Sequence, residues 1–271
     1  MKRYCQIMMC LLALISICAC AAPESKKENL PRLVIGVTIY EPYFYRNNIG
    51  EYVGIDADLA REACKRIGYE PVFVELDADE RFDSLENGEV DCLWTCLTMA
   101  NREKDYLWVG PYLYTQRVVV VRADSDIQSL EDLAGKRMGV AAGTTSEAII
   151  LQGLNPDIPS LRQLTVLNTQ GEVFTALRKG YVDAIASQES VLRVYTEEYP
   201  EQYRYLNMSI RSEELGIAFK KDGDVQLAAR LTDALAEMVG DKTTEAIVEA
   251  YGLDVQKNVY GGTTDAQTES K

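Results

Sequence analysis

Residues 85–93 read LENGEVDCL and residues 177–185 read LRKGYVDAI, so the frame L-x-x-G-x-V-D occurs twice in the chain. The residues before the glycine and the glycine itself are typical of the end of a helix, and the apolar residues that follow the glycine predict a buried strand. Upstream of each copy lies a second matching strand, LVIGV from residue 33 and KRMGV from residue 136. The repeat therefore predicts two similar α/β lobes.

Both predicted lobes alternate short apolar runs with amphipathic stretches. The first lobe has expected strands at 33–37, 72–76 and 90–95 and an expected helix at 57–67. The second has expected strands at 118–121, 138–141 and 182–186 and an expected helix at 172–179, and a strand at 215–219 precedes closing helices at 225–239 and 243–251. Uninterrupted apolar strands between helices favour mostly parallel sheets covered on both faces.

The length of the chain suits two lobes of ordinary domain size. We assign residues 32–112 and 223–254 to lobe 1, residues 113–222 to lobe 2, and residues 255–271 to a disordered tail. The expected hinge crossings lie around residues 112–116 and 220–223.

The amino terminus has the pattern of a secretory signal at residues 1–19, with two basic residues and then an apolar run too short to span a membrane stably. The segment ICAC ends at Cys20 and resembles a bacterial lipobox, whereas Cys18 follows a bulky isoleucine and is the weaker candidate. Acylation of Cys20 would anchor an extracytoplasmic protein to the bacterial cell membrane, with residues 20–31 as a tether.

The charge and composition of the chain exclude several functions. The formal net charge is −14, and loss of the two basic residues of the signal leaves −16, which argues against a nucleic-acid partner. The sequence contains no histidine, so serine–histidine and cysteine–histidine catalysis are excluded.

The cysteines beyond the lipobox do not form a recognisable metal motif. Cys64 has helical spacing with neighbouring apolar residues and is expected in the core. Cys92 and Cys96 could bind a metal or form a bridge, but two thiols without further ligands make a weak site. We expect unpaired, mostly buried thiols, no metal and no cofactor.

The segment GTTSE, residues 143–147, joins a second-lobe strand to a helix start. Unpaired N–H groups and the helix dipole favour an anion there. The segment has neither the phosphate-loop motif nor the glycine-rich dinucleotide-binding motif. A carboxylate fits the hydroxyls of Thr144 and Thr145. The alternative is that Thr144 and Glu147 form only a capping box.

The corresponding first-lobe segment is TCLTMANREK, residues 95–104. It supplies the hydroxyls of Thr95 and Thr98 and the planar cation of Arg102, which suits bidentate carboxylate binding, although a single surface arginine can also be merely solvated. In open α/β sheets ligands bind beyond the carboxyl ends of the strands, so two such lobes would enclose a ligand cleft.

Seven stretches together resemble the extracytoplasmic solute-binding proteins of family 3, the receptor components of ABC importers for polar amino acids. They are TIYEPYFY, GEYVGIDADLAREACKRIGYE, LENGEVDCL, GPYLYTQRVVVVR, SLEDLAGKRMGVAAGTTSE, LRKGYVDAI and LGIAFKKD, and the resemblance runs from about Leu33 to Leu253. It implies a type II periplasmic-binding-protein-like fold, an interlobe cleft for an amino acid, a membrane permease as partner, and a monomer without enzyme activity.

The resemblance also implies roles for particular residues. The expected first-lobe ligand contacts are Tyr40 over the ligand side chain, Ala78 and Asp79 on the wall, Thr95, Cys96 and Thr98 at the α-amino and α-carboxylate groups, and Arg102 at the carboxylate. Three residues separate Thr98 from Arg102, where the family commonly has four. The expected second-lobe contacts to the carboxylate are Ala141, Thr144 and Thr145.

The ammonium partner departs from the family pattern. The usual aspartate, five residues after the Asp of VDA, is here Gln188, and Glu189 is adjacent. Either residue could meet the ammonium, and Glu189 could instead be an exposed helical carboxylate. We expect a neutral or basic polar amino acid as ligand, without naming which.

Two other functions remain open from the sequence. Prephenate and arogenate dehydratases resemble this fold and use a carboxylate base in the same cleft, for which Glu189 or Asp79 could serve. A sensor that hands ligand occupancy to a separate signalling protein is the other alternative.

Overall fold

The computed structural model describes residues 30–100 and 102–261. The predicted signal peptide, the lipidation at Cys20 and most of the tether lie outside the described residues, as do residues 262–271 of the expected tail. None of the helices in the described part combines the length and apolar character that a membrane span needs.

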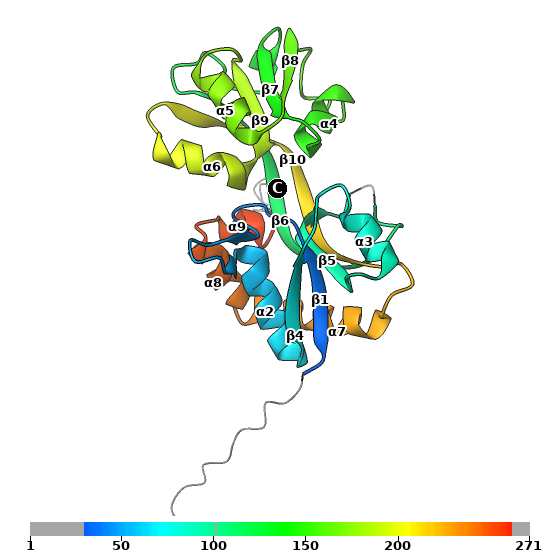
Figure 1. The fold of residues 1–271 in the computed structure, drawn as a ribbon. Helices are drawn as coiled ribbons and strands as arrows, with labels where there is room; N and C mark the ends of the chain where they lie inside the picture. Colours follow the sequence, from blue (N-terminus) through cyan, green and yellow to red (C-terminus); the bar gives the residue numbers. More distant parts are fainter. Residues whose placement is uncertain (1–29, 101, 262–271) are drawn as a thin grey trace, which may run out of the picture. The chain divides into compact units, whose positions relative to one another are not determined.

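One eight-stranded sheet runs through the described chain in the order β4-β1-β5-β10-β6-β9-β7-β8 (Figure 1). Its strands are β1 (Arg32–Val37), β4 (Glu70–Glu75), β5 (Cys92–Thr98), β6 (Leu107–Arg122), β7 (Arg137–Ala141), β8 (Gln163–Leu167), β9 (Ala184–Gln188) and β10 (Tyr203–Phe219). A separate hairpin joins β2 (Tyr45–Arg46) to β3 (Tyr52–Val53).

The helices flank the two halves of this sheet. Lobe 1 carries α2 (Ile55–Ile67), α3 (Arg81–Asn87), α7 (Val225–Gly240), α8 (Thr243–Ala250) and α9 (Val255–Asn258). Lobe 2 carries α4 (Thr145–Leu151), α5 (Gln170–Arg178), α6 (Glu189–Glu198) and the 3₁₀ turn η1 (Glu131–Leu133).

The halves of the sheet repeat one pattern. Strands β4, β1 and β5 are parallel with β10 antiparallel at their side, and β8, β7 and β9 are parallel with β6 antiparallel at theirs. Buried apolar clusters lie on both faces of each half: Leu59 and Leu231 represent one face of lobe 1 and Leu93 the other, and lobe 2 likewise has two clusters. The predicted fold of two similar α/β lobes is confirmed.

The glycines of the two L-x-x-G-x-V-D motifs end helices, as expected. Gly88 follows α3 with φ 74°, and Gly180 follows α5 with φ 72°. Glycine adopts this left-handed conformation without the Cβ clash that other residues meet. The chain can therefore reverse within a few residues and enter β5 or β9.

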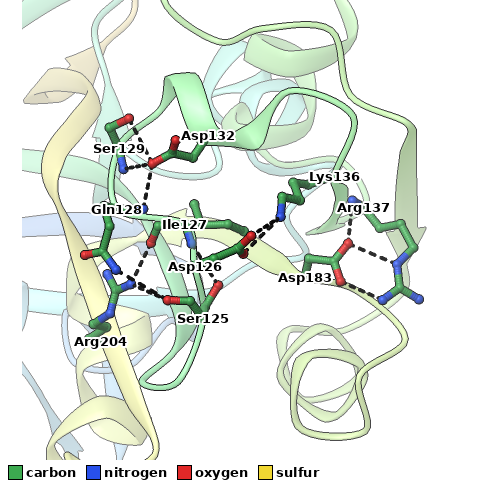
Figure 2. A network of polar contacts seen from close by, with 10 residues as sticks. All are labelled: Ser125, Asp126, Ile127, Gln128, Ser129, Asp132, Lys136, Arg137, Asp183 and Arg204. Carbon is green, nitrogen blue, oxygen red and sulfur yellow. Dashed lines mark hydrogen bonds and ion pairs between the residues drawn. The ribbon is translucent and has the colours of Figure 1, made fainter.

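The aspartates of the same motifs each bind the backbone of the neighbouring strand. Asp91 accepts a hydrogen bond from the Val34 N–H at 2.7 Å, and Asp183 accepts one from the Arg137 N–H at 2.9 Å. The Arg137 guanidinium also contacts Asp183, with Nη2 2.6 Å from Oδ1 (Figure 2). The repeated V-D pair thus fixes the parallel register at the start of each lobe's central strand.

Asp183→Ala should lower the free energy of unfolding by about 2 kcal/mol, because it removes charge-assisted hydrogen bonds and leaves the Arg137 N–H unpartnered. Arg137 lowers the pKa of Asp183, so this contribution is present at neutral pH and is lost as pH falls through the folded-state pKa. Urea denaturation at pH 7 measures it. The control is Asp126→Ala, whose ion pair with Lys136 involves a carboxylate that is 79% exposed. A loss at Asp183 no larger than at Asp126 would contradict the assigned role.

The lobe boundaries differ from the expected ones at the second crossing. Residues 112–116 cross between the lobes inside β6, but their partners in β10 are residues 212–215 rather than 220–223. Leu215 pairs with Thr98 of β5, and Ile217 lies in the core of lobe 1, so residues 215–222 belong to lobe 1 and not to lobe 2. The polar middle of β10 has the composition of a loop, yet it is one continuous strand with β6 as its neighbour.

Part of the expected disordered tail is also structured. Asp254 caps α9 by accepting a hydrogen bond from the Lys257 N–H at 2.9 Å, and Asn258 and Val259 are buried. An aspartate N-cap supplies the acceptor that a helix start needs. Residues 255–261 therefore extend the fold of lobe 1.

Candidate ligand-binding cleft

A cavity of about 380 Å³ lies between residues of the two lobes. It is lined by Thr38, Ile39, Tyr40, Ala78, Arg81, Thr95, Cys96, Leu97, Thr98, Arg102, Arg117, Gly143, Thr144, Thr145 and Gln188. An adjoining cavity of similar volume shares Thr98, Arg102 and residues 143–145 and adds Ala100, Ala148, Arg211 and Glu213. We call the two together the cleft. Each is at the small end of the range of about 300–1,000 Å³ for small-molecule sites.

Nine of the twelve predicted ligand residues line the cleft: Tyr40, Ala78, Thr95, Cys96, Thr98, Arg102, Thr144, Thr145 and Gln188. They lie at or just beyond the ends of β1, β4, β5 and β9 and at the start of α4, because strand ends in both lobes face the same space. The sequence motifs that supplied them are far apart in the chain and converge only in the fold.

Three predicted ligand residues do not line the cleft. Asp79 is exposed beside Ala78. Ala141 ends β7 in the core, and its carbonyl accepts a hydrogen bond from Thr144 Oγ1 at 2.7 Å. Glu189 forms an ion pair with Lys257 at 2.9 Å, because the strand-to-helix turn after Gln188 directs it towards α9.

Thr144 caps α4 as well as lining the cleft. Its Oγ1 accepts a hydrogen bond from the Glu147 N–H at 3.3 Å, and Glu147 Oε2 accepts one from the Gly143 N–H at 2.6 Å. Thr144 therefore caps α4 and also lines the cleft, but Glu147 bonds the Gly143 N–H instead of the Thr144 N–H, so the predicted capping box is formed only in its Thr144 half. The cap fixes the direction in which the Thr145 hydroxyl points, 3.2 Å from Arg117 Nη2.

Gln188 joins the two lobes at the floor of the cleft. Its Oε1 accepts a hydrogen bond from the Tyr40 hydroxyl at 2.9 Å. Its Nε2 donates to the Tyr43 hydroxyl at 3.0 Å and contacts Cys96 Sγ at 3.4 Å. Burial raises the pKa of Tyr40, so the hydroxyl stays protonated and remains a donor to Gln188 at physiological pH. The amide is thus held in one orientation by lobe 1.

Cys96 has the unusual backbone angle φ 51°. Its backbone N–H is held by a hydrogen bond to the buried carboxyl group of Asp56. Asp56 Oδ2 accepts a hydrogen bond from the Cys96 N–H at 2.8 Å, and Asp56 Oδ1 accepts one from the Tyr112 hydroxyl at 2.8 Å. Asp56 is 1% exposed, and burial raises its pKa to about 7 although both hydrogen bonds oppose the change. Asp56 links the wall of the cleft to the crossing strand β6.

Cys64, Cys92 and Cys96 are unpaired, and burial raises the pKa of each thiol. Among residues 30–100 and 102–261, His, Cys, Asp and Glu side chains form no group of three or more that could hold a metal ion. The thiol of Cys96 is therefore a neutral, weakly polar part of the cleft wall.

Three arginines absent from the sequence prediction also line the cleft: Arg81, Arg117 and Arg211. Arg117, on β6, places Nε 2.7 Å from Glu213 Oε2 on β10, and the two side chains are 11% and 0% exposed. Burial lowers the pKa of Arg117, but the charge of Glu213, its hydrogen bond and the nearby Tyr40 and Cys96 together outweigh burial, so the net change in pKa is upward. Arg117 lies in the segment GPYLYTQRVVVVR, residues 110–122. Its position in a strand near the crossing between the lobes was the only sequence feature that could have indicated a role in the cleft.

Arg81, the first residue of α3, is the second unpredicted arginine. Its guanidinium carbon lies 5.3 Å from the centre of the Phe82 ring, and that of Arg102 lies 4.9 Å from the same centre. The buried Nε of Arg81 has no hydrogen-bond partner in the described chain. Burial, and then the charge of Arg102, lower the pKa of Arg81. Nothing in the local sequence distinguishes Arg81 from an ordinary helix-surface arginine.

The chain is similar to proteins that bind amino acids. It is 32% identical over 236 residues to the histidine-binding periplasmic protein of Escherichia coli K12, covering 82% of this chain and 86% of the relative. It is 28% identical over 271 residues to the ABC transporter glutamine-binding protein GlnH of Bacillus subtilis, covering 92% and 97%.

Solved structures show the same fold. An ancestral arginine-binding protein bound to arginine superposes with a TM-score of 0.67 at 28% identity, covering 82% of this chain and 98% of that one. The ancestral amino acid-binding protein AncCDT-1, a precursor of cyclohexadienyl dehydratase, superposes with a TM-score of 0.67 at 26% identity, covering 81% and 95%. Residues 33–254 match the family profile described as bacterial extracellular solute-binding proteins, family 3, and the chain therefore belongs to that family.

Proposed function

We propose that this protein is the substrate-binding lipoprotein of an ABC importer, which captures a polar amino acid or similar small zwitterion in the cleft and delivers it to a membrane permease. The observation that carries the proposal is the convergence of Thr98 and Arg102 from lobe 1 with Thr144 and Thr145 from lobe 2 on one cavity. Hydroxyls and a guanidinium are suitable partners for an α-carboxylate.

A ligand held in this way bridges both lobes, and so it binds the closed arrangement better than an open one. Strands β6 and β10 carry the chain between the lobes and are paired along the crossing, for example Gln116 with Ser212. Bending of this two-stranded crossing would open and close the cleft. The closed form would then be the one that docks on the permease.

The proposed location is the outer face of the bacterial cell membrane. Support comes from the signal pattern at residues 1–19 and the lipobox ending at Cys20. A lipid on Cys20 would keep the receptor close to the permease.

We propose binding without turnover. The candidate bases Asp79 and Glu189 are not among the lining residues of the cleft, and Glu189 is paired with Lys257. Glu213 is the one carboxylate that the described part of the chain contributes to the cleft lining, and it is paired with Arg117. A general base must reach the proton that it removes, and this arrangement gives a dehydratase no such group.

Arg102→Gln should weaken binding by about 10- to 100-fold, because a hydrogen-bonded charge partner of the ligand carboxylate is lost. A thermal-shift screen of the 20 common amino acids and short dicarboxylates identifies the strongest ligand, and titration calorimetry with that compound measures the change. The matched control is Arg178→Gln on the exposed surface of α5. Equal affinities of the wild type and Arg102→Gln would remove Arg102 from the site.

A further inference from the structure

We infer that the cleft selects a solute with two carboxylate groups and a net negative charge, such as a dicarboxylic amino acid. This rests on the proposed function and replaces the expectation of a neutral or basic ligand.

The lining of the cleft is cationic in an acidic protein. Within residues 30–100 and 102–261, the first cavity is lined by Arg81, Arg102 and Arg117 and by no aspartate, glutamate or lysine, while the adjoining cavity adds Arg211 and Glu213. Four guanidinium groups thus face one carboxylate, although the chain as a whole carries a formal charge of −14. This local excess favours an anion over a cation of the same size.

Two of the four arginines already have a carboxylate partner. Glu213 lies 2.7 Å from Arg117 and 3.7 Å from Arg211. Its remaining oxygen, Oε1, is buried without a hydrogen bond, but its charge is shared between two cations. The negative charge of Glu213 is therefore already neutralised by Arg117 and Arg211, and Glu213 is a poor partner for a cationic group of the ligand.

The other two arginines, Arg81 and Arg102, form no ion pair with a carboxylate in the part of the chain that the structure describes. Both guanidinium groups contact the ring of Phe82, and the Nε of Arg81 is buried without a partner. Two neighbouring cations repel each other and have lost part of their hydration, and a bound anion relieves both costs. One carboxylate at Arg102 and a second at Arg81 would match this pair.

The cleft wall at Gln188 lacks the charge that a basic ligand needs. Gln188 is neutral, and its amide is bonded to Tyr40 and Tyr43. Glu189 is held by Lys257 at 2.9 Å. A guanidinium, imidazolium or second ammonium on the ligand would meet neutral groups there, whereas the α-ammonium of an amino acid can use hydroxyl and carbonyl oxygens.

Titration calorimetry on the purified protein tests the charge preference directly. The probes are L-glutamate, L-aspartate and glutarate, with L-glutamine, L-arginine and L-histidine as ligands of similar size without a net negative charge. We expect at least one dicarboxylate to bind at least tenfold more tightly than glutamine, arginine and histidine. Tighter binding of any of those three would overturn the inference and leave the proposed function standing. If no amino acid and no dicarboxylate binds, the proposed function fails as well.

Arg81→Gln tests the residue that sets the preference. We expect it to weaken dicarboxylate binding by about 10- to 100-fold, the effect of losing one charge-assisted contact, and to leave the affinity for glutamine within about threefold. Arg178→Gln, with the same loss of charge at a distant exposed site, should change neither. Thermal unfolding without ligand verifies that each variant is folded, and Arg81→Lys should retain part of the dicarboxylate affinity. Unchanged selectivity in folded Arg81→Gln would overturn the assignment.

Discussion

Arg117→Met is expected to lower the free energy of unfolding by about 3–5 kcal/mol, which is the usual cost of removing one partner from a buried ion pair. Arg117 Nε lies 2.7 Å from Glu213 Oε2, and the Glu213 side chain is fully buried. Without Arg117, the carboxylate keeps only Arg211, at 3.7 Å and with poorer geometry. The methionine fills much of the volume of the arginine stem, so the loss would arise chiefly from the uncompensated charge.

Urea denaturation of the wild type, of Arg117→Met and of the double variant Arg117→Met/Glu213→Met measures this effect. The double variant should recover most of the loss, because two apolar side chains of similar volume can replace a buried pair. Lys136→Met is the control, since its partner Asp126 is 79% exposed and such solvent-screened pairs contribute little to stability. If Arg117→Met lowers the free energy of unfolding no more than Lys136→Met does, Glu213 is not held as a buried charge.

The repeat L-x-x-G-x-V-D was sufficient to predict the two lobes because it encodes local events. A glycine that must adopt a positive φ and an aspartate that binds the next strand both act within one helix–strand unit. The crossing strands β6 and β10 could not be delimited in the same way. Residues 209–214 read SIRSEE, and their polar side chains at the crossing have the composition of a loop.

The cleft was predictable where it depends on strand ends and less so where it depends on side-chain direction. Thr95 and Thr98 follow from the end of β5, and Thr144 from the start of α4. Gln188 and Glu189 are adjacent in sequence, yet the turn from β9 to α6 directs one to the cleft and the other to Lys257. Arg81 becomes a cleft residue only through the packing of α3 beside β5, which local spacing does not report.

The second large effect concerns Asp56, whose pKa burial raises from 3.8 to about 7. Between about pH 4 and pH 7 the folded state therefore holds a proton that the unfolded state has already released. Stability from this group is fully present below the unfolded-state pKa and falls as pH rises through the folded-state pKa. The difference amounts to about 4 kcal/mol above pH 7, at about 1.4 kcal/mol per pKa unit. This direction is opposite to that of Asp183, whose pKa is lowered.

Asp56→Asn should remove this pH dependence, because asparagine has the shape of the protonated acid. Its Oδ1 can accept the hydrogen bond from the Cys96 N–H, and its Nδ2 can donate to the Tyr112 hydroxyl, replacing the contacts seen at 2.8 Å. We expect the variant to exceed the wild type by about 1.5 kcal/mol at pH 5 and by about 4 kcal/mol at pH 8, because the wild type loses about 1.4 kcal/mol per pH unit between the two pKa values. Urea denaturation of both proteins across this range measures the difference, in which the titration of all other groups cancels. A difference that does not change with pH would mean that Asp56 stays ionised throughout, and that its two hydrogen bonds outweigh its burial.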